Sequence, residues 1–227
     1  MKIIYEDGHL LVIDKPAGLS VLPNGWEKDS QYLVKMLEEQ YRQIFIVHRL
    51  DKITSGVMVF ARDAETHRDL NTQFESHQAE KVYHALVEGN PKWEQKVATH
   101  PLRANVGHKH RTMVDDKSGK PSETRFRIIK RYPEAALIEA RPMTGRTHQI
   151  RVHAYALGHP LVGDALYGAQ ETYGIAGPML HAQSLSFIHP RTEERVKFTA
   201  PHPTDFEEAI KQIGADYIPP QGTTKFF

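Results

Sequence analysis

The first residues of the chain alternate between apolar runs and polar breaks, as antiparallel strands do. Residues 3–5 and 10–13 are mostly apolar, and they flank Asp7-Gly8, a dipeptide typical of tight turns. The pattern therefore predicts a β-hairpin at the start of the chain. Similar runs predict buried or half-buried strands at residues 44–47, 56–61, 82–88, 124–132, 135–140, 180–187 and 196–199.

Four segments show features expected of helices. Leu33, Leu37 and Tyr41 recur at helical spacing, and Asp29 or Ser30 can cap the helix that contains them. The other three are a helix capped by Asp63 with a sparse apolar side, a helix capped by Thr147 with Ile150, Ala154 and Leu157 on one side, and a short helix over residues 206–210.

The predicted strands do not alternate regularly with helices. This order argues against a doubly wound parallel sheet and favours an α+β fold with a mainly antiparallel sheet. The chain shows no internal repeat and no low-complexity linker. We therefore expect one domain over residues 1–215 and a loosely held tail over residues 216–227.

Composition narrows the classes of protein. The chain has 227 residues, enough to bury its own core. It contains no cysteine, which excludes disulfides, thiolate metal sites and cysteine nucleophiles. No apolar run has the length of a signal-peptide core at the start or of a membrane span elsewhere. We therefore expect a cytoplasmic protein without a membrane partner.

Charge is distributed unevenly along the chain. The net charge is only +1, but the stretch from Arg103 to Arg151 holds 12 Lys/Arg against 5 Asp/Glu, a local charge of +7. The remainder holds 17 against 23, a charge of −6. Such asymmetry indicates a polyanionic partner. An ordinary solvated charged face explains it equally well.

A polar loop, residues 48–55, joins two of the predicted strands and contains Asp51. Functional residues are often found on loops that a rigid scaffold positions. Arg49 and Lys52 flank this carboxylate. The residues alone leave open whether Asp51 is catalytic or forms ordinary surface ion pairs.

A second polar segment, residues 142–153, places Arg146 just before the predicted helix start at Thr147. Backbone N–H groups and a guanidinium would then lie close together, an arrangement suited to an anion. The anion could be a phosphate or a carboxylate of the protein itself. The alternative is an exposed basic helix start.

Other catalytic patterns are absent from the sequence. His148 and His153 would lie roughly 140° apart around a helix, too far to share one ion easily. There is no His-Glu-x-x-His pattern, no glycine-rich phosphate loop and no Gly-x-Ser-x-Gly motif. We therefore expect no catalytic metal.

Short motifs recur along the chain in a specific order. They are Val-Ile-Asp-Lys-Pro-Ala-Gly at 12–18, His-Arg-Leu-Asp at 48–51 with Thr-Ser-Gly at 54–56, Lys-Val-Tyr-His-Ala-Leu-Val-Glu-Gly at 81–89, Thr-Gly-Arg-Thr-His-Gln-Ile-Arg-Val-His at 144–153, Gly-His-Pro-Leu-Val-Gly-Asp at 158–164 and Leu-His-Ala at 180–182. Each motif is weak alone. In this order, from about residue 3 to residue 200, they resemble the RluA-type pseudouridine synthases.

The resemblance implies a fold and a set of roles. The fold is a mixed, mainly antiparallel bent central sheet with flanking helices and a cleft across its middle. Asp51 matches the catalytic aspartate, and Arg146 matches the arginine that pairs with it. Tyr83 matches the tyrosine that stacks on the target uracil and takes part in proton removal. Ile150 matches an apolar position lining the pocket, and Arg49 matches a residue that holds RNA with the base extruded.

The implied reaction needs no cofactor. It breaks the glycosidic C–N bond of uridine, turns the base and rejoins it through carbon, without a redox step. Whether Asp51 acts as nucleophile or as base stays open. We expect the Arg146 guanidinium to offset the desolvation of this carboxylate, and Arg146→Ala to destabilise the protein because it strands a buried charge.

The expected partner is RNA. A uracil inside a stack cannot be reached, so it must flip out. The chain starts almost directly with the predicted hairpin, so we expect the S4-type domain of many relatives to be missing. That layout resembles RluA-type members which modify a tRNA anticodon stem-loop and a 23S rRNA hairpin, and also tRNA-directed relatives of the TruC kind. We expect a monomer acting on one or both kinds of RNA.

Two other functions compete with this interpretation. The first is a non-catalytic RNA-binding protein on the same fold; the presence of Asp51, Tyr83 and Arg146 argues against it. The second is a metal-dependent phosphodiesterase or nuclease that uses Asp51 with histidines. Chelators would abolish the activity of the second and leave a pseudouridine synthase unaffected.

Overall fold

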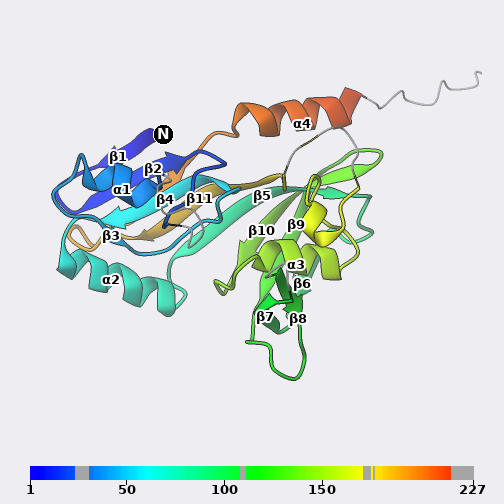
Figure 1. Cartoon of the computed structure of the whole chain (residues 1–227), viewed down its shortest axis with the longest axis horizontal. Coiled ribbons are helices and arrows are strands. Elements are labelled where there is room, and N and C mark those ends of the chain that lie inside the picture. The colour runs from blue at the N-terminus through cyan, green and yellow to red at the C-terminus, as the bar shows by residue number, and fades with distance from the viewer. Residues whose placement is uncertain (24–30, 108–110, 171–174, 176, 216–227) are drawn as a thin grey trace, which may run out of the picture.

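A ten-stranded sheet forms the body of the protein (Figure 1). The structure is a computed structural model, and it describes residues 1–23, 31–107, 111–170, 175 and 177–215. The strands of this sheet are β1 (Lys2–Glu6), β2 (Leu10–Lys15), β3 (Phe45–Ile46), β4 (Ser55–Ala61), β5 (Glu80–Glu88), β6 (Gln95–Ala98), β9 (Thr124–Arg131), β10 (Ala135–Pro142), β11 (Leu180–Ile188) and β12 (Arg195–Thr199).

The sheet is mixed but mainly antiparallel. Its order is β1-β2-β4-β11-β5-β10-β9-β6, with β12 paired to β11 and β3 paired to β4. Among the strand pairs of the described residues, only β4 and β11 run parallel, with His181 opposite Ser55. The expected α+β class and mainly antiparallel sheet are confirmed.

The remaining elements surround this sheet. They are α1 (Leu33–Glu38), α2 (Ala64–Glu75), α3 (Gln149–Ala156), α4 (Thr204–Ala215), the short 3-10 helix η1 (Ala165–Tyr167) and a separate hairpin of β7 (Leu102–Val106) and β8 (Arg111–Val114). In Figure 1 this hairpin extends away from the sheet, beyond α3. The tail over residues 216–227 lies outside the described residues.

Two local predictions hold because short-range hydrogen bonds decide them. Asp7 closes the β1–β2 turn by accepting from the backbone N–H groups of His9 and Leu10, at 2.7 and 2.6 Å. Asp63 caps α2 by accepting from the N–H of Thr66 at 2.8 Å. Both the predicted hairpin and the predicted cap are confirmed.

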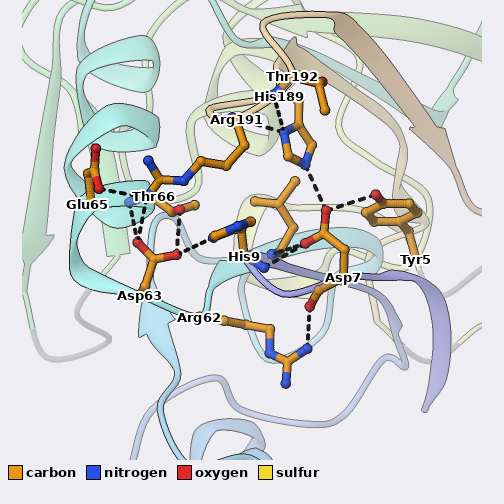
Figure 2. A network of polar contacts seen from close by, with 11 residues as sticks. Tyr5, Asp7, His9, Arg62, Asp63, Glu65, Thr66, His189, Arg191 and Thr192 are labelled. Atoms are coloured by element: carbon orange, nitrogen blue, oxygen red, sulfur yellow. Dashed lines mark hydrogen bonds and ion pairs between the residues drawn. The ribbon is translucent and has the colours of Figure 1, made fainter.

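A network of polar side chains joins this end of the sheet to the β11–β12 turn (Figure 2). His189 Nε2 lies 2.9 Å from the Asp7 carboxylate, and Arg191 contacts Asp63 at 3.2 Å. Burial alone would raise the pKa of Asp7, but its hydrogen bonds, first those from the backbone of His9, lower it to about 2. The network joins the end of β1, the start of α2 and the turn after β11. These segments lie far apart in sequence, so no local motif predicts the contacts between them.

The predicted helices differ from the observed ones mainly at their ends. The proposed caps of α1, Asp29 and Ser30, lie outside the described residues. Thr147 does not cap α3, because His148 occupies the N-cap position and the helix starts at Gln149. The last helix is longer than predicted, covering Thr204–Ala215.

Tertiary packing explains the extra length of α4. Its buried residues Phe206, Ala209 and Ile213 belong to one core cluster with Leu86 of β5 and Tyr132. The buried side of α3 agrees with prediction, since its apolar residues pack with strands β5 and β10. The members of that cluster from α3 are Ile150 and Ala154, with Leu157 partly buried against it.

Candidate active site

The loop between β3 and β4 carries Asp51, and buried neighbours fix its backbone. Lys15 is fully buried, and its ammonium group donates to the carbonyl oxygen of Lys52 at 3.3 Å. The N–H of Gly18 donates to the same carbonyl at 2.8 Å. Within the loop, the N–H of Thr54 donates to the carbonyl of Asp51 at 3.0 Å. The opening motif of the chain therefore holds the loop that follows it by more than thirty residues in sequence.

Gly56 permits the close approach that places this loop on the sheet. Its φ is +112°, and a Cβ atom at this position would lie 2.2 Å from the carbonyl oxygen of Ala182 in β11. No side chain fits there. The Thr-Ser-Gly part of the loop motif therefore marks the point where β4 meets β11 in parallel.

Four segments far apart in sequence converge on one cavity of about 520 Å³. They are the β3–β4 loop, the end of α2, the first half of β5 and the β10–α3 connection. The five residues singled out from the sequence all line this cavity: Arg49, Asp51, Tyr83, Arg146 and Ile150. A cavity of this size is within the usual range for sites that hold small organic groups.

The predicted ion pair between Asp51 and Arg146 is not formed. The Nε of Arg146 donates to the carbonyl of Pro121 at 3.2 Å, and the residue is exposed. Asp51 instead lies 3.8 Å from Nε2 of His148. The expectation that Arg146→Ala strands a buried charge is therefore wrong.

The turn before α3 explains why the predicted geometry differs. The Gln149 side chain accepts from the N–H of Arg146 at 3.0 Å and from the hydroxyl of Thr144 at 2.6 Å. His148 follows this turn with φ of 53°, a left-handed conformation. The turn brings His148, rather than Arg146, to the carboxylate.

Tyr83 lies beside Asp51 as a protonated phenol. Burial raises the pKa of the Tyr83 hydroxyl, and the negative charge of Asp51 raises it further. A phenol of this kind donates a hydrogen bond readily and removes a proton poorly at neutral pH. Its ring, partly buried against two core clusters, still lines the cavity.

Sequence reasoning assigned no role to several other cationic or titratable residues at the site. Lys81 lines the cavity, and burial lowers the pKa of its ammonium group. Burial likewise lowers the pKa of His48 to about 3, with Lys81 contributing, and His48 Nε2 accepts from the N–H of Val59. For Lys15, burial lowers the pKa to about 8 although Asp51 acts in the opposite direction. Each of these residues lies within one of the sequence motifs given above, and membership of a motif was the only sign in the sequence that it belongs to the site.

Six of the 12 basic residues between Arg103 and Arg151 pair with carboxylates in the described part of the folded protein. Arg127 and Arg141 both pair with Glu139, at 3.0 and 2.9 Å. Further pairs are Arg103 with Asp115, Arg125 with Glu123, Arg131 with Glu94 and Arg151 with Asp164. Of these carboxylates only Glu94 and Asp164 lie outside the stretch, so pairing leaves most of its local charge of +7 in place.

Two features of other protein classes are absent from the described residues. Within residues 1–23, 31–107, 111–170, 175 and 177–215, no group of three or more His, Asp or Glu side chains is arranged to hold a metal ion. No helix in the same part of the chain is long and apolar enough to cross a membrane.

Fold and cavity together define an α+β protein whose sheet carries a site large enough for a small organic group. Residues 9–156 match the family described as RNA pseudouridylate synthase. The chain belongs to this family, and members of it isomerise uridine in RNA.

Individual relatives are similar over almost the whole chain. The "Ribosomal large subunit pseudouridine synthase C" of Vibrio cholerae is 38% identical over 218 residues, which cover 93% of this chain and 69% of the relative. The "Dual-specificity RNA pseudouridine synthase RluA" of Vibrio vulnificus is 36% identical, covering 96% and 89%. Among solved structures, "Human RNA Pseudouridylate Synthase Domain Containing 1" has a TM-score of 0.74 at 28% identity, covering 89% and 83%.

Proposed function

We propose that this enzyme forms pseudouridine with Asp51 as its catalytic carboxylate and Tyr83 as the platform for the flipped uracil. The observation that carries the proposal is the meeting of Asp51, Tyr83 and Arg146 on one cavity of about 520 Å³. Flipping a base costs a few kcal/mol. Stacking on an aromatic ring returns roughly 1–3 kcal/mol, so Tyr83 offsets much of that cost.

The charge states support a division of roles. Asp51 is partly exposed at the cavity, with 24% of its side chain accessible, so it can meet the sugar of a bound nucleotide. Tyr83 keeps its proton, so its proposed role is stacking and hydrogen bonding rather than proton removal. Ile150, 6% exposed, supplies an apolar wall. Arg49 and Arg146 are exposed at the same cavity and are proposed to meet RNA phosphates.

The proposed target is a tRNA anticodon stem-loop, a 23S rRNA hairpin, or both. One similar protein is named as a dual-specificity RNA enzyme and another as a ribosomal large subunit enzyme, at 36% and 38% identity. These two values are too close to favour one RNA. We propose the cytoplasm as the location and residues 1–215 as the catalytic domain.

Tritium release tests the reaction directly. When the base is rejoined through C5, the hydrogen on that carbon is lost, so RNA made with tritium at C5 of uridine releases label to water. We expect release from a transcribed tRNA or 23S rRNA hairpin with the wild-type protein, and at least a thousandfold less with Asp51→Asn. Binding of the same RNA by Asp51→Asn should stay within about threefold of wild type.

Other outcomes would favour the competing functions. RNA binding by the wild type without tritium release from any tRNA or rRNA would support a non-catalytic binder. Cleavage of the RNA that stops on addition of a chelator, without release of tritium, would support the metal-dependent phosphodiesterase or nuclease. Undiminished release with Asp51→Asn would remove this residue from the chemistry while leaving the family assignment intact.

A further inference from the structure

His148 lies between the proposed catalytic carboxylate and a buried tyrosine. Its Nε2 is 3.8 Å from Oδ2 of Asp51, and its Nδ1 is 2.9 Å from the hydroxyl of Tyr167. Its backbone has φ of 53° and ψ of 20°, a left-handed conformation that is unfavourable for a residue other than glycine. The fold retains this strained conformation at the residue that reaches Asp51.

The hydrogen bonds favour the tautomer of His148 whose Nε2 carries the proton. The N–H of Thr112 in β8 donates to the Tyr167 hydroxyl oxygen at 2.9 Å. The single O–H of Tyr167 is then free to donate to Nδ1 of His148. When Nδ1 accepts from this hydroxyl, the proton of a neutral ring lies on Nε2, facing Asp51.

The ring is neutral near pH 7. Burial lowers the pKa of His148, opposed by Asp51 and Asp164 and assisted by Arg151 and Arg49. The separation of 3.8 Å from Asp51 exceeds that of a direct hydrogen bond, so the contact is electrostatic. A neutral N–H group at this distance can orient the carboxylate without a competing positive charge.

Buried neighbours hold the Tyr167 ring in place, and this fixes the position of the hydroxyl that contacts His148. It is 4% exposed, and the guanidinium of Arg151 lies over its ring at 4.9 Å. Arg151 makes two hydrogen bonds of 2.6 Å to Asp164, and these two side chains are 3% and 1% exposed. Such a doubly bonded, buried pair leaves the ring little freedom to move.

We propose that His148 and Tyr167 are positioning residues that orient the Asp51 carboxylate and link it to the β7–β8 hairpin. This inference rests on the proposed role of Asp51. Thr112, at the other end of the chain of hydrogen bonds, belongs to the strand that projects beyond α3 (Figure 1). RNA that contacts the hairpin would thereby act on the geometry of the carboxylate through three named groups.

Tyr167→Phe is the sharpest test, because it keeps the ring below Arg151 and removes only the hydroxyl. With C5-tritiated stem-loop RNA that the wild type modifies, we expect kcat to fall about tenfold, the value of one hydrogen bond, with KM unchanged within twofold. Tyr155→Phe is the matched control: its ring lies 6.3 Å from that of Tyr167, it is exposed, and it should behave as wild type.

His148 variants separate positioning from a merely structural effect. We expect His148→Ala to lose more activity than His148→Gln, whose amide can still donate near Asp51. Added imidazole should restore part of the kcat of His148→Ala, since it can occupy the vacated space. A structural role would lower the melting temperature and show no rescue.

The outcomes discriminate between this inference and the proposed function. Folded Tyr167→Phe and His148→Ala with wild-type kcat would overturn the positioning role, as would a change confined to KM. If Tyr167→Phe does not fold, wild-type kcat in His148→Ala overturns the inference, and a kcat loss rescued by imidazole supports it. Full activity of Asp51→Asn would instead overturn the role of Asp51 on which the inference rests.

Discussion

Replacing Asp164 by Asn should strongly destabilise the protein, because it leaves the Arg151 charge buried without its counter-ion. The two side chains are 1% and 3% exposed and share two hydrogen bonds of 2.6 Å. Removing one partner of a buried ion pair costs roughly 3–5 kcal/mol. Each kcal/mol lowers the melting temperature of a chain of this size by about 2–4 °C, so the expected loss is roughly 6–20 °C.

Thermal and urea unfolding of matched variants would measure this loss. Glu123→Gln is the control, since it breaks the exposed pair with Arg125, whose side chains are 59% and 34% accessible, and should cost no more than about 1 kcal/mol. Arg151→Met combined with Asp164→Leu should be less destabilised than the sum of the single changes. Equal losses in Asp164→Asn and Glu123→Gln would refute the reasoning.

Three further predictions follow from the same structure. Gly56→Ala should lower the free energy of unfolding by roughly 2–6 kcal/mol, because the new Cβ meets the Ala182 carbonyl oxygen at a residue with positive φ. The control Gly8→Ala, with nothing within 4 Å of its Cβ, should cost little, and similar stabilities of the two variants would contradict the packing argument. Burial lowers the pKa of His181 to about 4, so between about pH 4 and pH 6.5 the unfolded chain binds a proton at this residue that the folded chain does not. The midpoint of urea unfolding should therefore fall as the pH drops from about 6.5 towards 4, and a constant midpoint would contradict the burial of a neutral His181. Arg49→Ala should weaken RNA binding and reduce its logarithmic salt slope by about one, while Lys35→Ala on α1 should leave the slope unchanged; equal slopes in Arg49→Ala and wild type would exclude a phosphate contact.

Local signals made the strands and one helix cap predictable. Asp7 and Asp63 each accept from backbone groups two or three residues away, so their neighbours in sequence determine the outcome. The extra turns of α4 were not predictable in this way, since they depend on packing against Tyr132 and Leu86.

The site shows the same division between local and distant causes. The sequence motifs identified the β3–β4 loop, β5 and the β10–α3 connection, and the five site residues predicted from them all line one cavity. The motifs did not reveal which cation reaches Asp51. That depends on Gln149, whose side chain bonds to Thr144 and to the backbone of Arg146 and so shapes the turn before α3. The spacing of residues in the sequence does not predict these hydrogen bonds.

The position of β11 has a consequence for how the enzyme is made. This strand, Leu180–Ile188, lies between β4 and β5, which precede it by about a hundred residues. On a ribosome, the strand bearing Tyr83 and the loop bearing Asp51 are synthesised long before the strand that joins them. The nascent chain therefore exposes two open sheet edges until residue 188 has emerged, and such edges are prone to aggregate. Assembly of the cavity is thus a late event in biosynthesis, dependent on a segment that contributes few of the cavity's own side chains.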